Sequence, residues 1–138
     1  MTQSRSITAN FAFDPPDGPL TRYVDDDSAD PQAPYTNVAH AATNIQDAVD
    51  VSFSNDLILV SAGVYDTGTR VVHGSMKNRV AIDVPVTVRG IGGVATTIIR
   101  GEGPVGDGAV RCVYLGTNAL LEGFTLTNGH TRAQGKRI

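Results

Sequence analysis

Short apolar runs separated by polar turns dominate the chain after residue 56. The runs are rich in β-branched residues, and the segments between them contain Gly, Pro, Asn and Asp. Runs of four to eight residues with such boundaries are typical of β-strands. The strands expected here are LILV (57–60), RVAI (79–82), VTVR (86–89), TIIR (97–100), RCVYL (111–115) and LLEGFTLT (120–127), with TRYVD (21–25) as an earlier one. This pattern predicts an all-β fold.

A helical pattern occurs once, at residues 44–53. Thr43 is followed three positions later by Gln46, which is the spacing of a capping box with Thr43 as the N-cap. Apolar residues then recur on one helical face, beginning with Ile45. Asn55 is expected to adopt the left-handed backbone conformation that ends a helix. A helix this short is not stable alone, so its apolar face is expected to pack against the strands.

The strand region contains an internal repeat. RVAIDVPVTVRG matches RCVYLGTNALLEG about 32 to 34 residues later, and this alignment pairs Arg79 with Arg111. Strands that repeat at a fixed period are typical of solenoids. A β-sandwich would instead show two-residue hairpin turns between longer alternating strands.

The order of these segments resembles a known group of proteins. RYVD, ATNIQDAVD, ILVSAGVYDTG, NRVAIDVPVTVRG, TIIRG and AVRCVYLGTNALLEGFTLTNG follow one another as in the opening of right-handed parallel β-helix proteins of the pectin-lyase-like superfamily. The resemblance implies a short right-handed parallel β-helix of about three coils over residues 21–132, with one α-helix that caps its N-terminal end. Residues 1–20 are then a leader or linker, and residues 133–138 a flexible tail.

The same resemblance bears on the extent and location of the protein. Members of this superfamily continue for many coils past the last strands seen here, so the chain is expected to be an N-terminal fragment of a longer solenoid. The family suggests an extracellular or cell-surface location, although the N-terminus shows no apolar segment typical of a signal peptide.

Composition narrows the classes of partner. The net charge is −3, lysine is rare and the arginines are dispersed, so a nucleic-acid partner is not expected. No apolar run approaches the roughly 20 residues that span a bilayer, and no membrane partner is expected. Cys112 is the single cysteine, which excludes a disulfide within the chain, and its apolar strand predicts a buried, inert thiol.

Two arginines are the first candidates for ligand binding. If Arg79 and Arg111 stack on successive coils, their strands lie about 4.8 Å apart. Guanidinium groups that close repel each other unless an anion or a carboxylate lies between them. Asp83 and Glu122 are the expected internal partners. An anionic polysaccharide of the uronate type is the alternative ligand, and the resemblance makes it the natural one.

The acidic run at residues 25–30 offers four carboxylates as ligands for calcium: Asp25, Asp26, Asp27 and Asp30. It lacks the glycine and the distal glutamate of an EF-hand, so a solvated acidic loop is the alternative.

Three histidines are weak candidates for a metal site. His40, His73 and His130 share no sequence spacing, and only coils or subunits brought together in space could combine them. No metal or other cofactor is predicted. No catalytic motif matches either, so no catalytic residue is assigned.

Three functions follow from these observations. The leading hypothesis is a non-catalytic structural or interaction module that self-associates, most simply as a dimer, through its uncapped C-terminal coil. A solenoid end without a cap exposes unpaired strand edges and apolar interior. The second hypothesis is a carbohydrate-active fragment that binds or cleaves polysaccharide. The third is a promiscuous hydrolase whose site forms at a subunit interface, which predicts that the histidines meet acidic residues.

Overall fold

The computed structural model of the chain describes residues 19–131. The predicted flexible tail and nearly all of the predicted leader therefore lie outside the described residues. The elements in chain order are β1 (Thr21–Val24), η1 (Val38–His40), α1 (Ile45–Asp50), β2 (Leu57–Val60), β3 (Gly63–Tyr65), β4 (Arg70–Val71), β5 (Lys77–Ile82), β6 (Thr87–Gly90), β7 (Thr97–Arg100), β8 (Val110–Leu115), β9 (Leu120–Glu122) and β10 (Thr125–Thr127).

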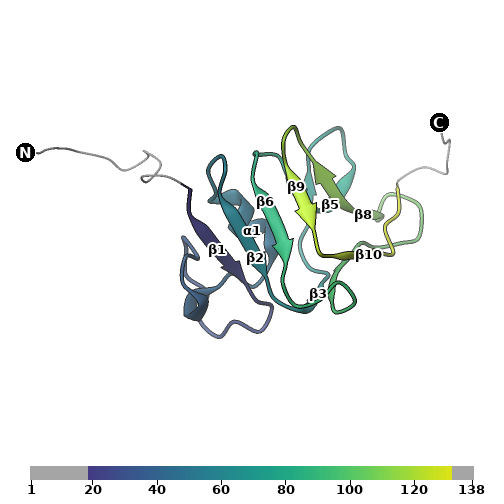
Figure 1. Ribbon diagram of the computed structural model, residues 1–138. Helices are drawn as coiled ribbons and strands as arrows, with labels where there is room; N and C mark the ends of the chain where they lie inside the picture. The colour runs from purple at the N-terminus through teal and green to yellow at the C-terminus, as the bar shows by residue number, and fades with distance from the viewer. Residues whose placement is uncertain (1–18, 132–138) are drawn as a thin grey trace, which may run out of the picture.

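The strands form three sheets that the chain visits in turn. Sheet A has the order β1-β2-β6-β9, sheet B the order β3-β7-β10, and sheet C the order β4-β5-β8. All pairs are parallel except β4 with β5, which form an antiparallel pair that the sequence pattern did not predict. The chain therefore forms a β-solenoid of roughly three turns with one short α-helix, which confirms the predicted architecture (Figure 1).

The predicted strand at 120–127 is divided between two sheets. β9 belongs to sheet A and β10 to sheet B, and Gly123 lies between them with a φ of 85°. Only glycine adopts this left-handed conformation without steric cost, so the chain turns a corner of the solenoid here. A continuous apolar run in the sequence therefore corresponds to two strands on adjacent sheets.

The interior is built from stacked side chains of equivalent residues. Parallel strands in register place paired residues on the same face of a sheet, and alternate residues point inward. In sheet A, Ile58 stacks on Val88, and Val88 stacks on Leu121. In sheet B, Tyr65 stacks on Ile99, while in sheet C Val80 pairs with Val113. β-Branched residues and leucine fill most of this narrow interior, and Tyr65 is the one aromatic residue of its buried core among the described residues.

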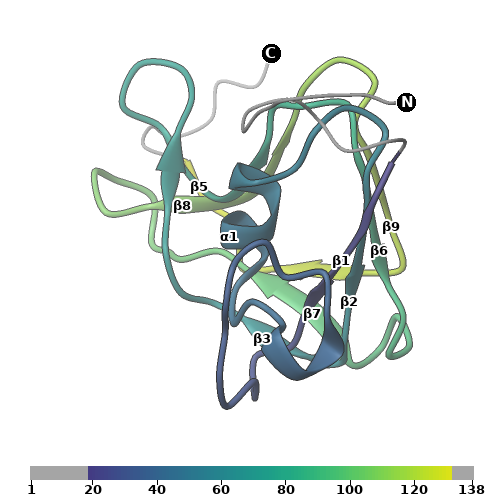
Figure 2. The same cartoon turned by 90° about the vertical axis from the view of Figure 1, so that its left-hand side faces the viewer.

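The helix α1 closes the N-terminal opening of the solenoid (Figure 2). Its buried face consists of Ile45, Ala48 and Val49, and it packs against β1, β2 and β5. The predicted N-cap is wrong by one residue, because the side chain of Asn44, rather than Thr43, accepts a hydrogen bond from the backbone N–H of Asp47 at 2.9 Å.

The end of α1 also differs from the prediction. The helix ends at Asp50, before the predicted boundary at residue 53. Asn55 has a φ of 74°, which confirms its left-handed conformation, but it lies in the loop that leads to β2. Within residues 19–131, no helix is long and apolar enough to cross a membrane.

Candidate functional site

The predicted stacking of Arg79 on Arg111 is wrong. β5 and β8 pair with an offset of 33 residues, so that Asn78 is the partner of Arg111 and Val80 that of Val113. The alignment that paired the two arginines was one residue too short. Because side chains alternate along a strand, a shift of one residue changes which neighbours a side chain meets. Arg111 instead donates from Nε to Oδ1 of Asn78 at 3.1 Å.

Arg79 is a buried residue that joins sheets B and C. Its Nε donates to the carbonyl of Arg100 at 2.7 Å and its Nη1 to the carbonyl of Gly68 at 2.6 Å, while Nη2 lies 3.6 Å from Glu102 Oε1. Protein carbonyls and one carboxylate therefore surround the guanidinium. This arrangement supports a structural role for Arg79 at the corner between two coils.

Cys112 occupies the equivalent position one coil later. Its Sγ donates to the carbonyl of Thr127 at 3.2 Å, and Thr127 is the register partner of Arg100, which accepts from Arg79. The thiol is partly buried and packs against the core, in a more open position than the sequence predicts. The repeat is therefore real, but it relates Arg79 to Cys112.

The two predicted acidic partners lie apart from these arginines. Glu122 accepts from Arg89 Nε at 2.5 Å, and the two residues are register partners on the exposed face of sheet A. Asp83 is exposed directly after β5, and no ion pair among the described residues joins it to Arg79 or Arg111. The four candidate residues thus do not gather into one ligand site.

The three histidines do not meet one another. His40 Nδ1 lies 3.3 Å from Asp30 Oδ2 in an exposed pair. His73 Nε2 lies 3.3 Å from the hydroxyl of Tyr114, and its ring packs edge-on against that tyrosine. His130 Nδ1 lies 3.0 Å from the carbonyl of Asn128. The histidines therefore have three separate local environments.

Three of the four predicted calcium ligands do come together. Asp25, Asp26 and Asp27 place one carboxylate oxygen each within 4.8 Å of one another, and this is the single group of potential metal ligands in residues 19–131. Asp30 pairs with His40 instead. Burial, followed by the charge of Asp27, raises the pKa of Asp26. The carboxylate of Asp26 also accepts a hydrogen bond from the backbone of Val64 in β3. This bond holds the edge strand of sheet B to the acidic loop.

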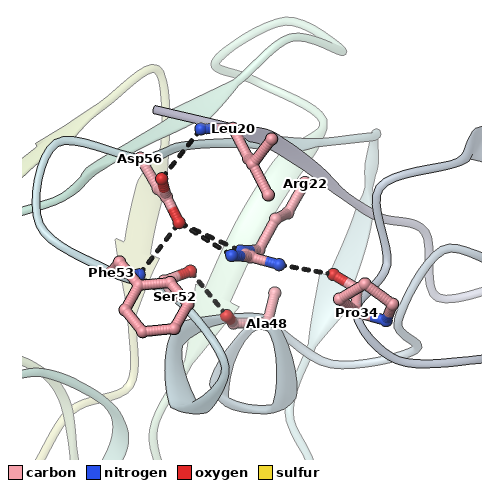
Figure 3. Close-up of polar contacts among 7 residues, drawn as sticks. All are labelled: Leu20, Arg22, Pro34, Ala48, Ser52, Phe53 and Asp56. Carbon is pink, nitrogen blue, oxygen red and sulfur yellow. Dashed lines mark hydrogen bonds and ion pairs between the residues drawn. The ribbon is translucent and has the colours of Figure 1, made fainter. Parts of the chain in front are cut away.

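Sequence reasoning missed a buried ion pair at the N-terminal end (Figure 3). Arg22 points inward from β1, and its Nη2 donates to Asp56 Oδ2 at 2.8 Å. Asp56 also accepts from the backbone N–H groups of Leu20, at 2.8 Å, and Phe53, at 2.9 Å. Arg22 Nη1 donates to the carbonyl of Pro34 at 2.8 Å. The alternation in TRYV, which places Arg22 and Val24 on one face, was the available signal.

This network lowers the pKa of Asp56. Burial by itself would raise that pKa, but the N–H groups of Leu20 and Phe53 and the charge of Arg22 outweigh burial. Arg22 is also the inward neighbour of Ile58 in the first coil. The ion pair therefore ends the stack of apolar side chains in sheet A and forms part of the N-terminal cap.

Polar groups close the N-terminal edges of sheets A and C. In sheet A, the backbone of Tyr23 bonds to Tyr35 and to Ala42. In sheet C, the side-chain amide of Gln46 on α1 bonds to both the N–H of Ala81, at 2.7 Å, and its carbonyl, at 3.0 Å. Gln46 thereby supplies the two hydrogen bonds that a neighbouring strand would make.

The C-terminal end of the solenoid is open by comparison. β8, β9 and β10 are the last strands of their sheets, and each has one neighbouring strand among the described residues. Inward positions become exposed here: Ile82 is fully buried, whereas its partner Leu115 is 47% exposed, and Leu126, the partner of buried Ile99, is 49% exposed. Figure 1 shows β9 and β10 at the side of the solenoid opposite β1. We name the surface formed by β8, β9 and β10 the open coil end.

Comparison with protein-family models, curated proteins and solved structures finds no match for this chain. The structure by itself shows a β-solenoid of roughly three turns.

Proposed function

We propose that this protein is a non-catalytic β-solenoid module that self-associates through its open coil end. The observation that carries the proposal is the contrast between the two ends. At the N-terminal end, α1, the Arg22–Asp56 ion pair and Gln46 cover apolar side chains and strand edges. At the other end, the same stacks finish in half-exposed leucines beside strand edges that have no partner strand within residues 19–131.

The apolar side chains at this end account for a substantial part of an association energy. Full burial of a leucine side chain is worth about 1.5–3 kcal/mol. Leu115 and Leu126 are each about half exposed, so burying both in each of two copies contributes about 3–6 kcal/mol. A micromolar dissociation constant requires about 8 kcal/mol of net free energy, in excess of the translational and rotational freedom lost on association. Partly buried Val113, Leu121 and Phe124 and new strand hydrogen bonds would supply the remainder.

Size-exclusion chromatography with light scattering tests the proposal, at protein concentrations from low to high micromolar and with or without EDTA. We expect a dimer that persists in EDTA. Leu126→Lys places a charge on the open coil end and should weaken association at least about tenfold, or 1.4 kcal/mol. Val38→Lys is the matched control, because Val38 is 66% exposed and lies in η1, which packs against β1 at the opposite end.

Three results would count against this function. A monomer at high micromolar concentration would exclude self-association of this chain. Equal weakening by the two lysine variants would exclude the open coil end as the interface. A dimer that dissociates in EDTA would indicate that a metal ion holds the copies together. The carbohydrate-active and hydrolase alternatives remain predictions. His40 meets Asp30 at 3.3 Å, as the hydrolase hypothesis predicts, but His73 contacts Tyr114 and His130 contacts the carbonyl of Asn128, so the three histidines do not converge on one site.

Kinship with the pectin-lyase-like superfamily is a second part of the proposal. Its support is the order of the elements, in which a helix at the N-terminal opening is followed by coils of three parallel sheets. An experimentally determined structure in which the coils wind left-handed would contradict it.

A further inference from the structure

The three edges of the open coil end differ in length, and their lengths restrict how two copies can meet. β8 has six residues, but its first residue, Val110, already pairs with Glu102 and accepts a hydrogen bond from His130, so its remaining edge has five residues (111–115). β9 and β10 have three residues each. A closed dimer of identical subunits has a two-fold axis, which here must lie perpendicular to the solenoid axis. Such an axis passes through one sheet, which then pairs with the same sheet of the second copy. Each of the other two sheets pairs with the other one in the second copy. Strands that meet in this way are antiparallel.

One position of the axis matches every strand length. When the axis passes through sheet C at Val113, residues 111–115 of β8 meet the same residues of the second copy, with inward side chains opposite inward side chains. β9 then meets β10 of the second copy. An axis through sheet A or sheet B would instead place the five-residue edge of β8 against a three-residue strand. Unmatched residues would leave backbone groups without partners, which is costly once they are buried.

The side chains agree with this arrangement. With β9 centred on β10 of the second copy, inward-facing Leu121 lies opposite inward-facing Leu126, and Glu122 lies opposite Thr125. Antiparallel residues that lie opposite each other share one face, so both leucines enter a joint interior. Glu122 is the only charged residue in β9 and β10, and it meets a neutral partner. No like charges are brought together along these strands.

The contact surface is close in size to that of a standard stable dimer interface. Residues 110–127 form the last coil, which amounts to 18 residues per copy. Standard stable interfaces use about 20–30 residues on each side. Neighbouring turns add to the last coil, and Gly129 already packs against Cys112. Head-to-tail stacking does not suit the structure, because α1 and Gln46 occupy the N-terminal end.

We infer that, given the proposed self-association, two copies pair through a two-fold axis in sheet C, with β8 against β8 and β9 against β10 of the second copy. This arrangement joins two three-turn solenoids into one continuous β-structure with a helical cap at each outer end.

Disulfide crosslinking of two single-cysteine variants tests the arrangement. Glu122→Cys and Thr125→Cys are each made in a Cys112→Ser background. Opposite residues of antiparallel strands have Cα atoms about 4.5–5.5 Å apart, within the range that a disulfide spans. We expect oxidation to yield covalent dimers when the two variants are mixed, and not when either variant is oxidised alone. Light scattering under reducing conditions is run on the same samples, to establish that each variant associates.

The outcomes separate this inference from the proposed function. If the unmodified chain is monomeric, both fail. If the chain dimerises and Glu122→Cys crosslinks when oxidised alone, the axis passes through sheet A, and the inference is wrong while self-association stands. The inference is also wrong, and self-association again stands, if the chain dimerises and the mixture gives no covalent dimer.

Discussion

Replacing Asp56 by Asn tests how strongly the N-terminal cap depends on its buried ion pair. Arg22 and Asp56 are 1% and 2% exposed. In Asp56→Asn, an amide nitrogen at the position of Oδ2 would face Arg22 and the N–H of Phe53, which are all donors. A buried charge that loses its partner costs about 3–5 kcal/mol. That is a large part of the 5–15 kcal/mol that stabilises an ordinary domain.

Urea denaturation followed by circular dichroism measures this cost. With a denaturant slope of about 1–3 kcal/mol per molar urea, the midpoint of Asp56→Asn should fall by about 2 M. The matched control is Arg89→Gln, since Arg89 and Glu122 form the same kind of pair at 47% and 44% exposure. An exposed pair is worth at most about 1 kcal/mol. All samples are compared at one protein concentration, because association also stabilises the folded state.

A double variant distinguishes the cost of an unpaired buried charge from the cost of changing the packing at this site. Arg22→Met with Asp56→Leu replaces both partners with apolar side chains, and such replacements are often neutral or stabilising. We expect the double variant to unfold at a higher urea concentration than Asp56→Asn. The reasoning is refuted if Asp56→Asn and Arg89→Gln lower the free energy of unfolding equally, by less than about 1 kcal/mol.

Two further predictions concern acid stability and the corner between β6 and β7. Because the pKa of Asp56 is lowered, its stabilisation is complete above the unfolded-state pKa of about 3.9 and is lost as the pH falls through the lower folded-state value. The difference in urea midpoint between the unmodified chain and Asp56→Asn should therefore narrow from pH 6 to pH 2, and a constant difference would contradict this. Gly90→Ala should cost about 1–3 kcal/mol in the same assay, because the new Cβ would lie 2.4 Å from the carbonyl oxygen of Gly123. Gly108→Ala, which has no atom within 4 Å of the new Cβ, should be nearly neutral, and an equal cost would argue against steric contact as the cause.

Local patterns determined much of this fold. Apolar runs of four to six residues located most strands, and apolar spacing located α1, because both signals depend on neighbours in the sequence. The repeat correctly indicated a solenoid. It did not determine register, since an offset of 32 and one of 33 look alike in a loose alignment. This difference of one residue in the offset is the difference between the predicted arginine stack and the observed pairing of Arg111 with Asn78.

Contacts between distant residues were decided only by the tertiary structure. Arg22 and Asp56 are 34 positions apart, and Gln46 and Ala81 are 35 apart, so no local pattern relates them. Their meeting depends on how the first coil stacks on the second and where α1 packs. The same is true of Leu115 and Leu126, which read as ordinary core residues in the sequence. They are about half exposed because no further strand lies beside the last coil within residues 19–131, and the exposure of a strand depends on what lies beside it.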